Sequence, residues 1–255
     1  MFEELVSYWK DSNNHTHPND SCLIEANERE TDENYKLHTD LYAEPYMGSL
    51  SKPKIVFLYL NPGYHEADDD IQKDNKIGNT LINVLRQSLN DTEYPFLWLD
   101  ADYKDTPKVK NPGAFYWNRL IDQKTGTSFL KCLAEAKWNA DETETARKRI
   151  ANNVCDIELF PYHSIKFDKK WLNTCSVRMA REAVIKAIYE NTDTLFVFMR
   201  SFSLWIPEEN DRLPISQREN VVINKAVRNP SLNPNLKPKN GETCIGRRIL
   251  DFLLS

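Results

Sequence analysis

Four short apolar runs constrain the fold of this chain more than any other feature of its sequence. They are Ile55–Leu60, Val154–Phe160, Thr194–Met199 and Val221–Val227. Each contains β-branched or aromatic residues and is shorter than a buried helix, which is typical of buried strands. Segments with a helical spacing of apolar residues lie between them. Strands that alternate with helices indicate an α/β fold with a central, mostly parallel four-stranded sheet and helices on both faces.

The helical segments are identified by a stripe of apolar residues on one face. Ser176–Glu190 is the clearest, because Val177, Ala180 and Val184 recur at helical spacing. The same criterion predicts helices at Phe2–Lys10, Asn79–Leu89, Phe115–Leu120, Ser128–Ala136, Glu142–Asn152 and Ile245–Leu254. We expect loop over residues 91–113 and, apart from one helix at most, over residues 11–40.

Length and composition favour one folded α/β domain over residues 1–255. Within it we expect a polar, partly helical N-terminal extension over residues 1–44 and a core over residues 45–255. No apolar run approaches the ~20 residues that a membrane span needs, and the N-terminus does not read as a signal peptide. The five cysteines are scattered and form no C-x-x-C pair, so we expect a reducing cytoplasm, no cofactor and no metal. The net charge of −5 disfavours nucleic-acid binding without excluding a local basic patch.

Two short motifs follow apolar runs and carry the candidate chemistry. Asn61-Pro62-Gly63 comes directly after the first run, and Asn229-Pro230-Ser231 comes shortly after the last. In an open α/β sheet, ligands bind at the carboxyl ends of the strands. The two motifs are therefore predicted to meet in a cleft at that edge, together with residues 158–163.

The order of these motifs resembles that of the uracil-DNA glycosylase superfamily. Leu60-Asn61-Pro62-Gly63 is similar to the first motif of its mismatch-specific branch, and residues 229–231 match the Asn-Pro-Ser version of its last motif. Between them the family has a strand end that bears the base-reading residue. Residues 158–161 look like this element, with Glu158 where an Asn commonly stands. The resemblance covers roughly residues 45–254.

The resemblance implies hydrolysis of the N-glycosidic bond of a base in DNA, as in DNA repair. Asn61 would position the attacking water, and Asn229 would donate a hydrogen bond to the leaving base. The base pocket would be formed by Leu60, Pro62, Gly63, Tyr64, Glu158, Phe160, Pro230 and Ser231. Nucleic acid would be bound by Lys225, Arg228, Lys237 and Lys239, with Leu232 as a wedge in the duplex. The partner is then DNA, a nucleotide or a base. No cofactor and no membrane are implied, and the oligomeric state is open.

Glu158 and the acidic run at residues 66–70 depart from this pattern. An ionised Glu158 only accepts hydrogen bonds, so it would repel O4 of uracil and suit an exocyclic amine. If burial raised its pKa, Glu158 would carry a proton and could donate a hydrogen bond. The acidic run would repel a DNA backbone that lay close to it. Two alternatives therefore stay open, a non-catalytic nucleotide-binding or nucleic-acid-binding protein on the same fold and a metal-dependent hydrolase that uses residues 65–70.

Overall fold

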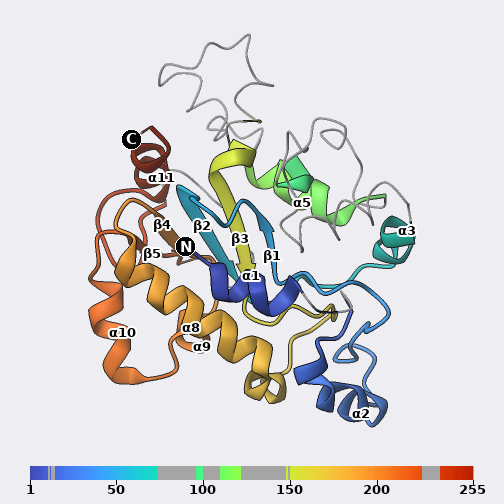
Figure 1. Ribbon diagram of the computed structural model, residues 1–255. Helices are drawn as coiled ribbons and strands as arrows, with labels where there is room; N and C mark the ends of the chain where they lie inside the picture. The colour runs from blue at the N-terminus through green and yellow to red at the C-terminus, as the bar shows by residue number, and fades with distance from the viewer. Residues whose placement is uncertain are drawn as a thin grey trace.

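The protein has an α/β fold built on a five-stranded, mostly parallel sheet. The computed structural model describes residues 1–10, 12, 15–73, 96–99, 110–121, 148, 150–225 and 236–254 (Figure 1). The sheet has the order β1-β3-β2-β4-β5. Its strands are β1 (Tyr46–Gly48), β2 (Ile55–Tyr59), β3 (Val154–Glu158), β4 (Leu195–Phe198) and β5 (Val221–Ile223).

The four predicted strands are confirmed, but the expected number of strands is one too small. Strand β1 pairs antiparallel with β3 and extends the sheet at that edge. Gly48 makes this pairing possible, because its φ is +96° and a Cβ there would lie 2.5 Å from the carbonyl oxygen of Val154. Residues 226–227, the end of the last predicted strand, lie outside the described residues.

The two faces of the sheet bury different clusters of side chains, because successive strand residues point to opposite sides. Ile55, Phe57 and Tyr59 of β2 face a cluster that includes residues of α5 (Pro112–Ile121) and α11 (Ile245–Leu254). Val56 and Leu58 face the opposite cluster, which includes residues of α1 (Glu3–Lys10) and α8 (Cys175–Glu190). Helices therefore cover both faces, as Figure 1 shows.

Several predicted helices are confirmed within a few residues of their expected ends, namely α1, α5, α8 and α11. The predicted helices at Asn79–Leu89 and Ser128–Ala136 lie outside the described residues, as does most of Glu142–Asn152. The structure adds helices that periodicity did not predict: α3 (Ala67–Lys73), α9 (Phe202–Trp205), α10 (Glu209–Ser216) and the short 3-10 helices η1 (Pro18–Asp20), η2 (Leu97–Leu99) and η5 (Lys169–Asn173). The one helix allowed for in residues 11–40 is α2 (Cys22–Glu28). None of the helices in the described ranges is long and apolar enough to cross a membrane.

The N-terminal segment is attached to the rest of the domain through a buried carboxylate. Asp20 has no exposed surface, and its Oδ1 accepts hydrogen bonds from the backbone N–H groups of Cys175 (2.8 Å) and Ser176 (3.2 Å). Its Oδ2 accepts a hydrogen bond of 2.7 Å from the Tyr162 hydroxyl. Thr174, which precedes α8, makes no capping side-chain bond. Asp20 thus caps α8 from a distant part of the chain.

A side-chain amide covers the outer side of β5. Asn240 Oδ1 accepts a hydrogen bond of 2.9 Å from the N–H of Ile223. Its Nδ2 donates to the carbonyl oxygens of Val221 and Ser216, both at 2.8 Å. The Lys239 N–H donates to the Ile223 carbonyl, and Arg248 Nη1 donates to that of Val221. These bonds satisfy outer groups of β5 that no other strand of the described residues pairs.

Candidate functional site

A cavity of about 340 Å³ opens at the carboxyl ends of β2 and β3. It is lined by the loop after β2, by the end of β3 and by Arg200, which follows β4. The chain passes from β2 to its neighbour β3 and then returns to β4 on the other side of β2. Such a reversal of strand order is where ligands bind in open α/β sheets. The cavity lies at the sheet edge that the sequence indicates.

The Asn-Pro-Gly loop lines the cavity in a conformation that requires glycine. Gly63 has a φ of +78°, and a Cβ on it would meet no atom within 4 Å. Glycine is therefore needed for the backbone angle and not for lack of space. Asn61 Nδ2 lies 3.3 Å from Ser164 Oγ and 3.4 Å from the Ser164 carbonyl oxygen. This contact directs the amide nitrogen of Asn61 toward Ser164, and no hydrogen bond within the described residues engages its Oδ1.

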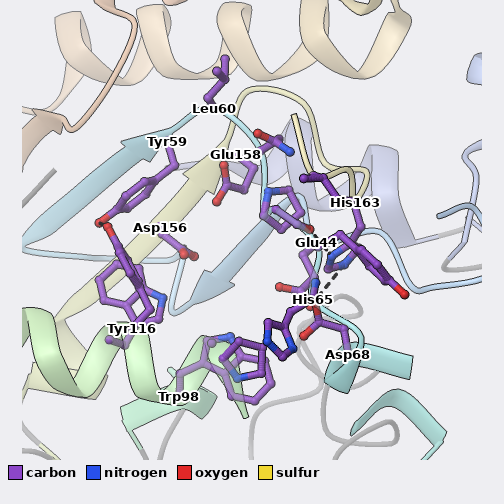
Figure 2. A pocket seen from close by; sticks show the side chains of 18 of the residues that line it. Glu44, Tyr59, Leu60, His65, Asp68, Trp98, Tyr116, Asp156, Glu158 and His163 are labelled. Carbon is purple, nitrogen blue, oxygen red and sulfur yellow. Dashed lines mark hydrogen bonds and ion pairs between the residues drawn. The ribbon is translucent and has the colours of Figure 1, made fainter. Parts of the chain in front are cut away.

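Two acidic side chains of β3 form the floor of the cavity. Asp156 and Glu158 lie two residues apart on one face of the strand, beside Phe57 and Tyr59 of β2 (Figure 2). Both are nearly buried, at 7 % and 9 % exposure. Glu158 Oε2 is fully buried and has no hydrogen-bond partner in the described structure. The pocket thus holds a polar atom whose hydrogen-bonding capacity is not used by any described residue.

Burial controls the protonation of these two carboxyl groups. Desolvation raises the pKa of Glu158 well above its usual value, and the nearby charges of Asp156 and Glu44 raise it further. The Arg200 guanidinium opposes this shift. Desolvation, followed by the charge of Glu44, likewise raises the pKa of Asp156 well above its usual value. Glu158 is therefore far easier to protonate than an exposed carboxylate, and its neutral form can donate a hydrogen bond.

His163 forms a buried connection between the Asn-Pro-Gly loop and the segment before β1. Its Nδ1 lies 2.8 Å from the Gly63 carbonyl oxygen, and its Nε2 lies 3.1 Å from that of Tyr42. A carbonyl oxygen only accepts, so both contacts are hydrogen bonds only when both ring nitrogens carry a proton. Burial lowers the pKa of His163, but the Glu44 carboxylate, 3.5 Å from Nε2, outweighs it, so the pKa is raised overall. When its ring is protonated, His163 can donate to both carbonyls and so tie the loop to the segment before β1.

Aromatic side chains form the wall opposite His163. Trp98, Tyr116 and Trp117 line the cavity together with Tyr59. The Tyr116 hydroxyl donates to that of Tyr59 at 3.2 Å. The Trp98 indole packs on Gly113, where a Cβ would lie 3.0 Å from the ring. Trp117 also packs on Phe57 of the sheet, so it both joins α5 to the sheet and lines the pocket.

The acidic run at residues 66–70 belongs to the first turn of α3. Asp68 Oδ2 accepts from the His65 N–H at 2.7 Å, and His65 Nδ1 accepts from the Ala67 N–H at 3.1 Å. The Tyr64 hydroxyl donates to Asp69 Oδ2 at 3.0 Å, and the Tyr64 ring stacks on His38. Acids are favourable in the first turn of a helix. Within the described residues, no group of three or more His, Cys, Asp or Glu side chains is placed to hold a metal ion.

The structure brings together some of the residues predicted for the base pocket and separates others. Lining the cavity are Leu60, Asn61, Pro62, Gly63, Tyr64 and Glu158. The Leu60 side chain packs with the cluster on the α8 side and points away from the other labelled side chains in Figure 2. Phe160 was expected to line the pocket. The structure places it, fully buried, in that cluster against Tyr162 and Trp171, and it does not line the cavity.

The last motif and part of the basic patch lie outside the described residues, namely Arg228, Asn229, Pro230, Ser231 and Leu232. The other predicted nucleic-acid contacts, Lys225, Lys237 and Lys239, are exposed and do not line the cavity. The Lys237 ammonium pairs with the Glu242 carboxylate. A role of these lysines in binding nucleic acid stays a prediction.

Sequence reasoning missed several residues of the site, among them Glu44, Trp98, Asp156 and Arg200. Asp156 had a usable signal, because a charged residue inside an apolar strand is rarely buried without a reason. Glu44, Trp98 and Arg200 lie in loops or short turns, where no periodicity indicates which way a side chain points.

Comparisons with known proteins found no match to this chain among protein-family models, curated proteins or solved structures.

Proposed function

We propose that the protein binds a nucleobase in this cavity and hydrolyses the N-glycosidic bond that joins the base to its sugar in DNA. The supporting observation is that Asn61 and Glu158 line one cavity with aromatic walls. Asn61 lies in the loop after β2, and Glu158 is the last residue of β3, the parallel neighbour of β2. The resemblance to uracil-DNA glycosylases, and with it a role in DNA repair, is part of this proposal.

The dimensions and surface of the cavity suit a planar heterocycle. Its volume of about 340 Å³ falls at the small end of ligand pockets in proteins. Indole and phenol rings such as those of Trp98 and Tyr116 offer faces on which a base can stack. The carboxyl groups on the floor would repel phosphate, so the base enters the cavity and the backbone stays outside.

The residues supply what cleavage of an N-glycosidic bond requires. Positive charge develops on the sugar as the bond breaks, and the bonding electrons leave with the base. The Glu44 carboxylate, which lines the same cavity, stabilises that positive charge. Water held by Asn61 Oδ1 attacks the sugar carbon and loses a proton to solvent. Glu158 in its neutral form protonates the leaving base, which is the role of a carboxylic acid with a raised pKa in glycoside hydrolysis.

Release of free base from a set of DNA oligonucleotides tests this function. Each oligonucleotide carries one uracil, thymine, hypoxanthine or unpaired standard base, in single-stranded and duplex form. We expect release of at least one base by the wild type and a loss of about 10²-fold or more in Asn61→Ala, since acid–base and water-positioning groups contribute roughly that much. Asn152→Ala, which changes an exposed amide outside the cavity, is the matched control and should retain activity.

A non-catalytic base-binding protein is the second candidate. It is favoured by the contact between Asn61 and Ser164, because an amide that is engaged by the protein is less free to orient water. In that case nucleosides bind, no base is released from any oligonucleotide, and Asn61→Ala changes affinity alone.

A further inference from the structure

We infer that the cavity selects bases that carry an exocyclic amine, such as cytosine and adenine, over their oxo counterparts uracil and hypoxanthine. This inference rests on the proposed function and names its substrate class. It is carried by the hydrogen-bonding groups on the cavity floor.

The floor is rich in hydrogen-bond acceptors. Asp156 and Glu158 project from one face of β3 into the cavity, and Glu44 approaches from the segment before β1 (Figure 2). Glu44 has a neighbour in His163, whose Nε2 lies 3.5 Å from its carboxyl oxygen. Glu158 Oε2, in contrast, is buried with no partner in the described part of the chain. A ligand group that donates a hydrogen bond to Glu158 would satisfy this atom.

Carboxyl groups accept hydrogen bonds in both of their protonation states. The ionised form accepts through two oxygens, and the neutral form still accepts through its carbonyl oxygen. A ligand N–H is therefore matched whatever the charge of Glu158. A ligand carbonyl is matched only when the carboxyl carries a proton. An acceptor-rich floor thus favours ligands with several N–H donors.

An exocyclic amine offers a second donor as well as the first. One N–H can reach Glu158 while the other faces Asp156, its neighbour on the same side of the strand. Neutral Glu158 can also donate to the ring nitrogen beside the amine, which completes a two-bond contact with cytosine or adenine. In uracil, a carbonyl oxygen takes the place of that amine and the ring nitrogen carries a hydrogen. Neutral Glu158 can still pair with both groups, but an ionised Glu158 and Asp156 then face the lone pairs of a carbonyl oxygen instead of an N–H donor.

The other charged or titratable groups that face Glu158 are Arg200, Tyr59 and Tyr116. The Arg200 guanidinium favours the ionised carboxylate and therefore strengthens the preference for donors. It is also the group through which a carbonyl-bearing base would be held if this inference were wrong. The experiment therefore has to distinguish a preference for amine-bearing bases from a preference for carbonyl-bearing bases.

Nucleosides in matched pairs provide that experiment. Deoxycytidine and deoxyuridine differ at the base edge by an amine in place of a carbonyl and by an acceptor ring nitrogen in place of a ring N–H. Deoxyadenosine and deoxyinosine differ in the same way. Binding is measured by calorimetry with the full chain at neutral pH. We expect the amine member of at least one pair to bind about tenfold tighter or better, as one good pair of hydrogen bonds to a base edge would give. Glu158→Gln, which keeps the shape and adds a fixed donor, should reduce this ratio severalfold.

Two further variants complete the test. Asp156→Asn should reduce the same ratio, so the inference stays testable if Glu158→Gln does not fold. Glu190→Gln, an exposed carboxylate at the end of α8, is the charge-matched control and should leave it unchanged. Equal affinities within both pairs, or tighter binding of the oxo members, overturn this inference and leave the proposed function intact. Absence of binding by every nucleoside overturns the proposed function and this inference together.

Discussion

At the scale of single residues, His163 determines how the candidate site is held together. One side chain connects the Gly63 carbonyl in the Asn-Pro-Gly loop to the Tyr42 carbonyl and to Glu44. Each contact needs a proton on its own ring nitrogen, so the two hydrogen bonds form together only when the ring is protonated. The geometry gives His163 both a structural role and a place in the cavity wall.

Substituting His163 by the two amides separates its two hydrogen bonds. His163→Asn keeps a donor near the position of Nδ1, and His163→Gln keeps one near Nε2. Each leaves one buried carbonyl without its partner, so each should lower the free energy of unfolding by about 1–3 kcal/mol in urea titrations.

The charge of His163 has its own measurement. Its imidazole resonances should titrate above pH 6.5, the ordinary value, and Glu44→Gln should lower that midpoint. A midpoint below 6.5 in the wild type would show that the ring is neutral and that one of the two contacts is not a hydrogen bond.

At the scale of elements, the N-terminus of α8 depends on a residue that lies far away in the sequence. Asp20 accepts from two backbone N–H groups of α8 and from the Tyr162 hydroxyl. A helix cap usually lies next to its helix, and here the adjacent Thr174 does not supply one. The first turn of α8 is therefore complete only when the N-terminal segment is in place.

Removing this cap should destabilise the whole fold. Asp20→Ala leaves buried donors without an acceptor and should cost about 1–3 kcal/mol in the free energy of unfolding. Asp20→Asn keeps one acceptor oxygen and should cost less. Urea unfolding followed by circular dichroism measures both, with the exposed Asp193→Ala as control. Equal stability of Asp20→Ala and wild type would mean that water replaces the cap.

Some of the helices and strands were predictable from the sequence, and others were not. The four parallel strands and the longest helix were predictable because their signals are local: apolar runs and a helical stripe. Strand β1 was not, because its three residues have no alternation and its pairing depends on Gly48 fitting against β3. Phe160 was assigned to the pocket beside Glu158, but β3 ends at Glu158, so strand alternation no longer determines which way Phe160 points.

At the scale of the whole molecule, the buried titratable groups of the site all change the free energy of unfolding in the same direction as the pH rises. Burial raises the pKa of Asp68 from 3.8 to about 6, and the pKa values of Asp156 and Glu158 are also raised. For each acid the folded state binds more protons than the unfolded state, so stability falls as pH rises above about 4. The raised pKa of His163 acts in the same direction, because its contribution is complete below pH 6.5 and is lost as pH rises through the folded value.

We therefore expect the free energy of unfolding to be larger at pH 5.5 than at pH 8. Asp68 alone accounts for about 1 kcal/mol of this difference, because the shift of its pKa from 3.8 to about 6 takes effect mostly below pH 5.5. Urea titrations at the two pH values measure the effect. Asp68→Asn, which retains an acceptor for the His65 N–H, should flatten the curve. Greater stability at pH 8 would contradict the assigned burial of these groups.

The location of the cavity in the fold was predictable from the sequence, whereas the complete set of side chains that line it was not. The edge at the carboxyl ends of the strands follows from the α/β pattern, and Asn61 and Glu158 follow from being at the ends of predicted strands. Glu44 reaches the cavity only because the chain before β1 runs along β3, a long-range arrangement that no local pattern encodes. The burial that raises the pKa of Glu158 likewise depends on the complete fold.

The amide of Asn240 has a consequence for the behaviour of the protein in concentrated solution. The last strand of an open sheet exposes N–H and C=O groups to which a strand of another molecule can add, and chains can aggregate in this way. Here the outer groups of Val221 and Ile223 are bonded to Asn240, Lys239 and Arg248 of the same chain. A second molecule would have to break these bonds before it could pair with β5. The edge of the sheet at β5 is thus protected against intermolecular strand addition by the same contacts that hold the chain between β5 and α11 in place.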